Sequence, residues 1–205
     1  MTTVASTDGR ILPTRERILS VALDRFGTRG FEASSLDEIA SAVGVRKQTV
    51  LYWFPSKDDL LRAVLEQAAD ELAAGVEAAV RAAPTDPLAR SDAVVEAAFR
   101  AAVRRPALLG LVRELSRLDP MMSDRLVERI RPLVGHAVAY LEAEMEAGRV
   151  RRCDPRLLLS LAYATVAGIA TEPEALRAVG WQPSIASLRR LRSELISFLR
   201  AALKA

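Results

Sequence analysis

Apolar side chains recur at steps of three and four residues along most of the chain, a spacing that gathers them on one face of a helix. The first series starts at Ile18 and reaches Phe26, and Gly27 and Gly30 close it. No stretch alternates apolar and polar residues at period two, and the β-branched residues are scattered among many alanines. The pattern predicts an all-α fold.

Capping residues and helix breakers mark the boundaries of the expected helices. Ser35, with Glu38 three positions later, forms a capping box that starts a short helix ending at Gly44. A second short helix follows, Pro55 ends it, and the next apolar series continues to about residue 83. The remaining helices, which bring the total to about nine, are expected at about 87–104, 106–118, 121–147, 155–171 and 184–203.

The composition narrows the class of protein. The chain has 205 residues, 50% of them hydrophobic and 27% charged, as in a water-soluble globular protein. No segment supplies the roughly 20 apolar residues of a membrane span, and the first residues lack a secretory core, so we expect a cytoplasmic protein with no membrane partner. Cys153 is the one cysteine of the sequence, and His136 is the one histidine. They predict no disulfide, metal site, cofactor or catalytic residue.

Residues 35–53 have the spacing of a helix-turn-helix, in which the second helix enters the DNA major groove. Ile39, Val43, Val45 and Val50 are placed to form a small shared core, and Gly44 lies at the tight turn. The formal net charge is only +3, so a nucleic-acid surface must be local. The first turn of the second helix supplies that surface through its base-reading side chains, Arg46, Lys47, Gln48 and Thr49.

The first quarter of the chain resembles the DNA-binding domain of the TetR family of transcriptional regulators. The matching positions are Arg17-Ile18-Leu19, Ala22-Leu23, Phe26, Gly30-Phe31, Ser35-Leu36-Asp37-Glu38-Ile39-Ala40, Gly44-Val45, Lys47, Thr49, Tyr52, Phe54-Pro55-Ser56-Lys57 and Leu60-Leu61. The rest of the chain is similar to that family only in its length and helical punctuation.

The resemblance implies three segments. Residues 1–12 form a flexible arm, and residues 13–61 form a three-helix DNA-binding domain whose last helix continues to about residue 83. Residues 62–205 form an α-helical domain for ligand binding and dimerisation.

The resemblance also implies the DNA contacts. Ser35, at a helix N-terminus, and Lys57 are expected to reach phosphates, while Tyr52 joins the four polar residues of the second helix at the DNA. Three positions depart from the family pattern. Leu51 replaces a common Tyr and could contact a thymine methyl, Gln48 replaces a common Gly and could read adenine, and Trp53 replaces a frequent His and is expected to pack in the core.

The second domain offers apolar stripes with few polar members. His136 and Tyr140 lie four residues apart on one helix face and could present polar groups to a pocket, although a buried, merely satisfied His is the equal alternative. The candidate effector-binding residues, most of which could equally be plain core, are Phe99, Leu111, Leu115, Met122, Leu126, His136, Tyr140, Tyr163 and Val166.

The two C-terminal helices carry wide apolar faces that need a partner. Paired with their symmetry mates, they predict a four-helix interface in a homodimer. The candidate interface residues are Leu158, Leu161, Leu188, Leu191, Leu195 and Phe198.

Together these features predict a regulator that binds double-stranded DNA at an inverted-repeat operator. Its expected form is a homodimeric repressor released by a small, largely apolar effector. Two alternatives are a constitutive DNA-binding protein without an effector and, less favoured, a helical-bundle enzyme.

Overall fold

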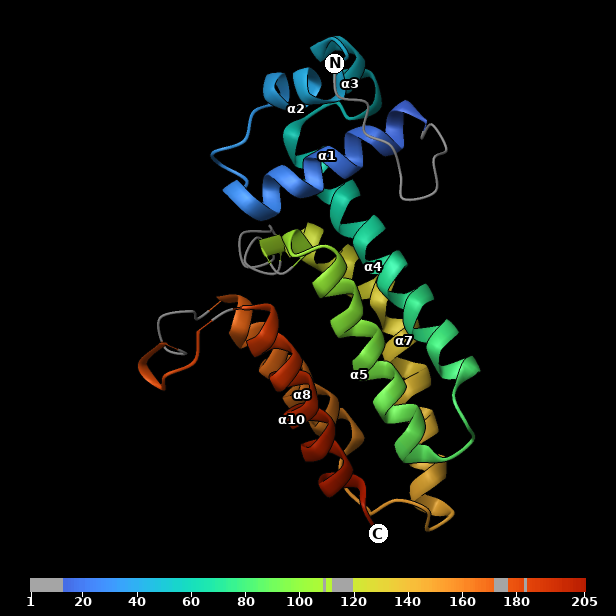
Figure 1. Ribbon diagram of the computed structural model, residues 1–205. Helices are drawn as coiled ribbons and strands as arrows, with labels where there is room; N and C mark the ends of the chain where they lie inside the picture. The colour runs from blue at the N-terminus through green and yellow to red at the C-terminus, as the bar shows by residue number, and fades with distance from the viewer. Residues whose placement is uncertain (1–12, 109, 112–119, 172–176, 183) are drawn as a thin grey trace. The chain divides into compact units, whose positions relative to one another are not determined.

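The computed structural model describes residues 13–108, 110–111, 120–171, 177–182 and 184–205. All regular elements in these ranges are helices, so the all-α prediction is confirmed. No helix among the described residues is both long and apolar enough to span a bilayer. The eight helices (Figure 1) are α1 (Thr14–Arg29), α2 (Leu36–Val43), α3 (Lys47–Trp53), α4 (Lys57–Ala82), α5 (Pro87–Arg104), α7 (Pro120–Glu146), α8 (Pro155–Thr171) and α10 (Ile185–Leu203).

Most helix ends lie where local sequence places them. The Asp86 carboxylate accepts a hydrogen bond from the Ala89 amide at 2.8 Å and caps α5, and the Ser184 hydroxyl caps α10 in the same way. The helix predicted at about 106–118 falls largely outside the described residues, as does the predicted arm at 1–12.

The chain divides into two compact units. The first contains the described residues up to Ala68 together with those between Pro106 and Ser123, and the second contains Ala69–Arg105 and Asp124–Ala205. The boundary therefore falls inside α4, a few residues beyond position 61, and the segment after α5 groups with the first unit rather than the second.

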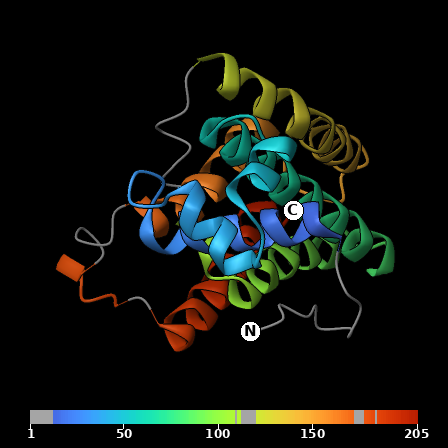
Figure 2. The same cartoon turned by 90° about the horizontal axis from the view of Figure 1, so that it is seen from above.

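The first unit is built on one apolar core shared by four helices. Figure 2 shows α1, α2 and α3 (blue to cyan) lying across one another. The fully buried side chains come from each of these helices and from α4: Ile18, Phe26, Ile39, Val50 and Leu60. The Arg17 guanidinium on α1 donates to the Val43 carbonyl at the end of α2, which satisfies one of the free carbonyls of that helix end.

Of the two glycines expected to close the first apolar series, Gly30 does so and Gly27 lies inside α1. The helix continues to Arg29, and Gly30 is its C-cap. A Cβ added at Gly27 would overlap the Ala107 backbone, and one added at Gly110 would overlap the Gly27 carbonyl. The two backbones thus meet directly, and a side chain at either position would separate them.

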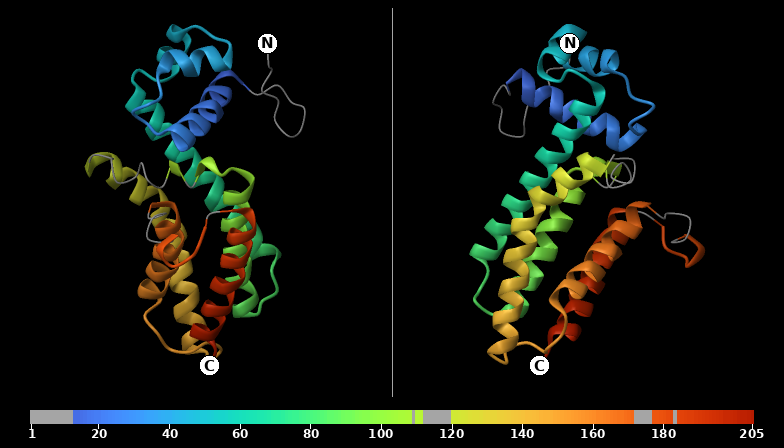
Figure 3. Two further views of the ribbon diagram at one scale, coloured as in Figure 1. Left: turned by 60° about the vertical axis from the view of Figure 1, so that its left-hand side comes forward. Right: turned by 180° about the vertical axis from the view of Figure 1, so that it is seen from behind.

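The second unit has its own apolar core. α10 runs along α5 (Figure 3), and the buried cluster includes Val95 and Phe99 from α5 with Leu195, Leu199 and Leu203 from α10. Arg200 of α10 donates through Nε to both carboxylate oxygens of Asp92, at 3.0 and 2.9 Å. This ion pair fixes the register of α10 against α5.

We predict that Gly27→Ala destabilises the first unit by about 1–3 kcal/mol, because the added methyl group has no free space beside Ala107. The matched control is Gly75→Ala in α4, where a Cβ meets nothing within 4 Å. That variant should gain up to about 1 kcal/mol from helix propensity. Urea unfolding followed by circular dichroism measures both, and equal shifts would contradict the close approach of the two backbones.

Candidate DNA-binding interface

The helix-turn-helix is set by short-range contacts at both ends of α2. The Ser35 hydroxyl accepts from the Glu38 amide at 3.2 Å, and the Glu38 carboxylate accepts from the Ser35 amide at 3.0 Å. At the other end Gly44 has φ 79° and ψ 36°, a conformation that side chains disfavour, and the Val45 amide donates to the Ala40 carbonyl at 2.9 Å. The capping box and the turn glycine occur as the sequence predicts.

The apolar side chains behind the turn hold α2 against α3. Ile39 and Val50 are fully buried, and Val43 is nearly so. Val45 is only half-buried, so it contributes less to this core than its spacing suggests. Because α3 has only seven residues, its orientation depends on Val50 and on the buried Phe54 that follows it.

The polar side chains of α3 and its N-cap remain open to water. Arg46 and Gln48 are exposed, and Lys47, Thr49 and Leu51 are half-exposed. These five of the eight predicted contact residues are therefore accessible to a groove of DNA.

Tyr52 and Trp53 form an aromatic pair at the end of α3. Tyr52 is 79% exposed, and its ring stands edge-on to Trp53 with 5.4 Å between centroids. Trp53 is itself 43% exposed, so the expectation that it packs in the core is wrong. Phe54 takes that buried place instead, because the chain leaves the helix at Phe54 and turns its ring inward.

Two predicted DNA-contacting lysines have partners within the protein. The Lys47 ammonium lies 2.7 Å from the Asp37 carboxylate of α2. The Lys57 ammonium lies 4.2 Å above the centre of the Phe31 ring and 3.4 Å from the Glu32 carbonyl. Arg46, in contrast, has no ion-pair partner among the described residues. The Asp37 contact could not be predicted from spacing, because the two residues lie ten positions apart on different helices.

The N-terminus of α2 already holds a carboxylate. Ser35 donates its amide and its hydroxyl to Glu38, and these hydrogen bonds lower the pKa of Glu38 below its usual range, with Arg29 adding to the effect. Arg29 lies 3.6 Å from Glu38. The Ser35 hydroxyl is therefore engaged as a helix cap, and its predicted phosphate contact would have to compete with that carboxylate.

The predicted effector-binding residues are distributed over both units. Phe99 is buried in the second unit, while Leu111 is buried in the first. His136 is exposed, Tyr163 is 61% exposed, and Tyr140 is half-buried. Leu115 lies outside the described residues, as do the side chains of Met122, Leu126 and Val166.

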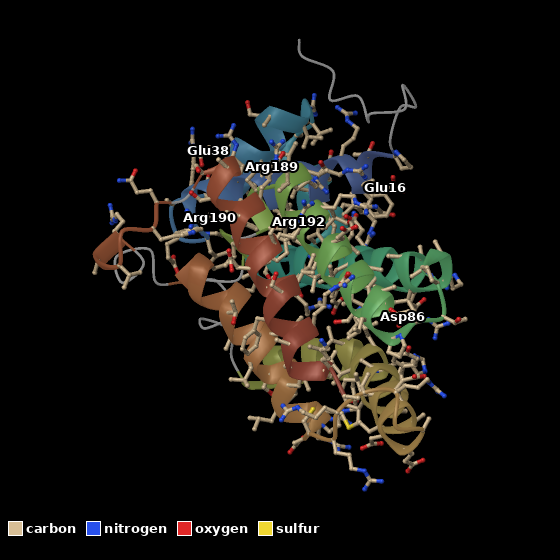
Figure 4. The ribbon with its side chains drawn as sticks, turned by 60° about the horizontal axis from the view of Figure 1, so that its bottom comes forward. Glu16, Glu38, Asp86, Arg189, Arg190 and Arg192 are labelled. Atoms are coloured by element: carbon tan, nitrogen blue, oxygen red, sulfur yellow. The ribbon has the colours of Figure 1, made fainter. Side chains whose placement is uncertain are left out.

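The predicted dimer residues divide into buried and exposed sets. Leu158 and Leu195 lie in the core of the single chain, and Leu188 and Leu191 are half-buried. Leu161 and Phe198 are 49% and 53% exposed. Figure 4 shows three arginine side chains on the first half of α10: Arg189, Arg190 and Arg192.

The described residues contain no group of three His, Cys, Asp or Glu side chains arranged to hold a metal ion. Cys153 is a free thiol of intermediate exposure.

Comparisons with known proteins agree with the geometry of the first unit. Residues 18–64 match the family model for bacterial regulatory proteins of the tetR family. The HTH-type transcriptional regulator RutR of Escherichia coli K12 is 30% identical over 152 residues, which cover 74% of this chain and 71% of RutR. The transcriptional activator FasR of Mycolicibacterium smegmatis is 42% identical over 94 residues, covering 44% and 42% of the two chains.

A solved structure extends the similarity to nearly the whole chain. The crystal structure of AibR in complex with isovaleryl coenzyme A and operator DNA superposes with a TM-score of 0.72 at 18% identity, covering 91% of this chain and 97% of AibR. The chain belongs to the TetR family. It is a DNA-binding transcriptional regulator with an N-terminal helix-turn-helix, and not an enzyme.

We predict different effects for Lys47→Ala and Lys57→Ala on DNA binding. If Lys47 reads a base, its loss should cost about 1–3 kcal/mol and relax specificity at one operator position. Loss of Lys57 should weaken binding to every duplex. The slope of log affinity against log salt concentration should become shallower by about one unit, because one phosphate contact disappears. Fluorescence anisotropy against an in-vitro-selected operator and a random duplex, at several salt concentrations, measures both. Identical profiles for the two variants would contradict the assignment.

We predict that Asp37 limits binding to non-specific DNA, because a phosphate must displace its carboxylate from Lys47. Asp37→Asn should raise affinity for random duplex up to about fivefold and lower the ratio of operator to random binding. Glu16→Gln, on the exposed face of α1 (Figure 4), removes the same charge without an ion pair among the described residues. Equal effects of the two substitutions would show that only net charge matters.

Proposed function

We propose that the chain is a homodimeric repressor that leaves an inverted-repeat operator when a small, largely apolar effector binds its second unit. The observation that carries the dimer is the exposure of large apolar side chains on α8 and α10. Leu157, Leu161 and Phe198 are each about half exposed in the single chain, at 59%, 49% and 53%. Apolar surface of this kind on a soluble protein marks an interaction site.

A two-fold dimer also matches the symmetry and half-site spacing of an inverted-repeat operator. One seven-residue reading helix contacts few base pairs, and a dimer presents two such helices to half-sites about one DNA turn, roughly 34–36 Å, apart. An inverted repeat mirrors the two-fold axis of the protein.

The effector proposal is supported by the shared fold and by the chemistry of the second unit. AibR, which has the same fold, was crystallised with both isovaleryl coenzyme A and operator DNA. The core of the second unit is built from aliphatic side chains, Phe99 and Met145, which suit a largely apolar ligand. Such a ligand releases the operator only if it binds the released conformation more tightly than the DNA-bound one.

The experiment combines binding and transcription. A duplex from the promoter of the protein's own gene should bind more tightly than random DNA, and a panel of small apolar compounds should contain one that reverses the binding. In vitro transcription from that promoter should fall when the protein is added and recover with the same compound. Stimulation of transcription would instead identify an activator, and operator binding that no compound reverses would favour a constitutive DNA-binding protein.

We predict that Leu161→Glu combined with Phe198→Glu produces a monomer, because two charges enter the proposed interface. Operator affinity should fall roughly 100-fold or more when the two reading heads are no longer linked. Val134→Glu on α7, where the valine is 44% exposed, is the matched control and should remain a dimer. Leu195 is unsuitable for this test, since it is 5% exposed and its replacement would disrupt the core. Sedimentation velocity measures the oligomeric state of each variant. A monomeric wild-type protein would contradict the proposal.

A further inference from the structure

The second unit contains two buried hydrogen-bond donors without an acceptor. The hydroxyl of Tyr140 on α7 and the Nε of Arg90 on α5 are both inaccessible to water, and neither makes a hydrogen bond of acceptable geometry among the described residues. The Arg90 guanidinium approaches the hydroxyl oxygen, but this contact gives the phenol proton no acceptor. Buried polar atoms are nearly always paired in folded proteins, because leaving one unpaired costs about 1–3 kcal/mol. Two such atoms in one contact therefore point to a missing partner.

The two donors belong to a single pair of side chains. The central guanidinium carbon of Arg90 lies 5.2 Å from the centre of the Tyr140 ring. Burial raises the pKa of Tyr140 above its usual value of 10.0, although Arg90 partly opposes this. The phenol therefore keeps its proton at neutral pH, and both side chains offer N–H or O–H groups to the same neighbourhood.

The nearest carboxylate is already occupied. Glu144, one helical turn after Tyr140, is 7% exposed, and both of its carboxylate oxygens accept from Arg149, one of them at 3.0 Å from the guanidinium. Arg149 is largely exposed and takes both oxygens of Glu144, and no ion pair joins Arg90 to a carboxylate among the described residues. A neutral acceptor would satisfy the hydrogen bonds but not the charge of Arg90, whereas an oxyanion satisfies both.

Apolar side chains flank the pair. Leu88, close to Arg90 in α5, and Leu141, next to Tyr140 in α7, both pack against the cluster of Val95, Phe99 and the other core residues. A ligand held at Arg90 and Tyr140 therefore meets hydrocarbon on the core side of its anionic group.

We propose that Arg90 and Tyr140 anchor the carboxylate of an effector whose remaining atoms are apolar. This inference rests on the effector-responsive function proposed above and specifies the chemical class of the effector. Arg90 donates through Nε and Tyr140 through its hydroxyl, and the carboxylate pairs with the Arg90 guanidinium. Neither residue is among the proposed dimer or DNA contacts, so the site can be tested by itself.

The test uses the full-length chain and two probes of equal length, octanoate and octanamide, in isothermal titration calorimetry. Octanoate should bind about tenfold more tightly than octanamide, because charged hydrogen bonds are worth more than neutral ones. Tyr140→Phe removes one oxygen and keeps the ring beside Arg90. It should weaken octanoate binding about tenfold and octanamide binding by less, because the hydrogen bond lost to octanamide is a neutral one. Arg90→Met should abolish the preference for the carboxylate.

Two substitutions serve as matched controls. Tyr163→Phe removes a hydroxyl from a residue that is 61% exposed, and Arg100→Met removes a charge from an exposed position of α5. Both should bind octanoate like the wild type, and circular dichroism establishes that every variant is folded. Equal binding of the two probes, loss of octanoate binding in the controls, or no saturable octanoate binding would overturn the inference. Inorganic phosphate binding as tightly as octanoate would overturn the assignment to a carboxylate with an apolar tail.

Operator release separates this inference from the proposed function. If octanoate binds through Arg90 and Tyr140 but the operator stays bound, the anchor stands and regulation by such an effector fails. If a neutral compound releases the operator and octanoate does not bind, the proposed function stands and the anchor fails.

Discussion

The reading surface of this regulator depends on one small apolar core shared by four helices. α2 has eight residues and α3 has seven, lengths at which an isolated helix is not stable in water. Their positions are fixed because Ile39 and Val50 are fully buried where α2 packs against α1 and α3. Every side chain proposed to contact DNA between Arg46 and Tyr52 takes its direction from that core.

Two of the three cations in the proposed DNA interface, Lys47 and Lys57, already have partners within the protein. Lys47 rests on Asp37, and Lys57 rests on Phe31 and the Glu32 carbonyl. The exposed Lys47–Asp37 ion pair and an exposed cation–π contact such as that of Lys57 are each worth about 1 kcal/mol or less, so DNA could displace them at small cost. The net charge of only +3 fits this arrangement.

In the second unit, the apolar residues of α8 and α10 divide into a buried set and an exposed set. In α10, Leu195 and Leu199 face the core with Val95 and Phe99, while Phe198, beside them in sequence, is left at the surface. The same contrast occurs in α8 between Leu158 and Leu161. The core thus uses one side of each helix, and a neighbouring strip of apolar residues remains available for a partner chain.

The sequence by itself determined the features that depend on residues three or four positions apart. The apolar periodicity, the Ser35–Glu38 capping box and the turn at Gly44 all follow from local backbone geometry, and they sufficed to predict the helices and the helix-turn-helix. Tertiary structure alone decided the rest. Gly27 lies inside α1, and only the packing shows that the Ala107 backbone leaves no space for a side chain there. The Lys47–Asp37 and Arg90–Tyr140 contacts join residues on different helices, so no spacing rule reveals them. Which residues meet in these contacts depends on how the helices pack against one another, and that packing is set by the whole core.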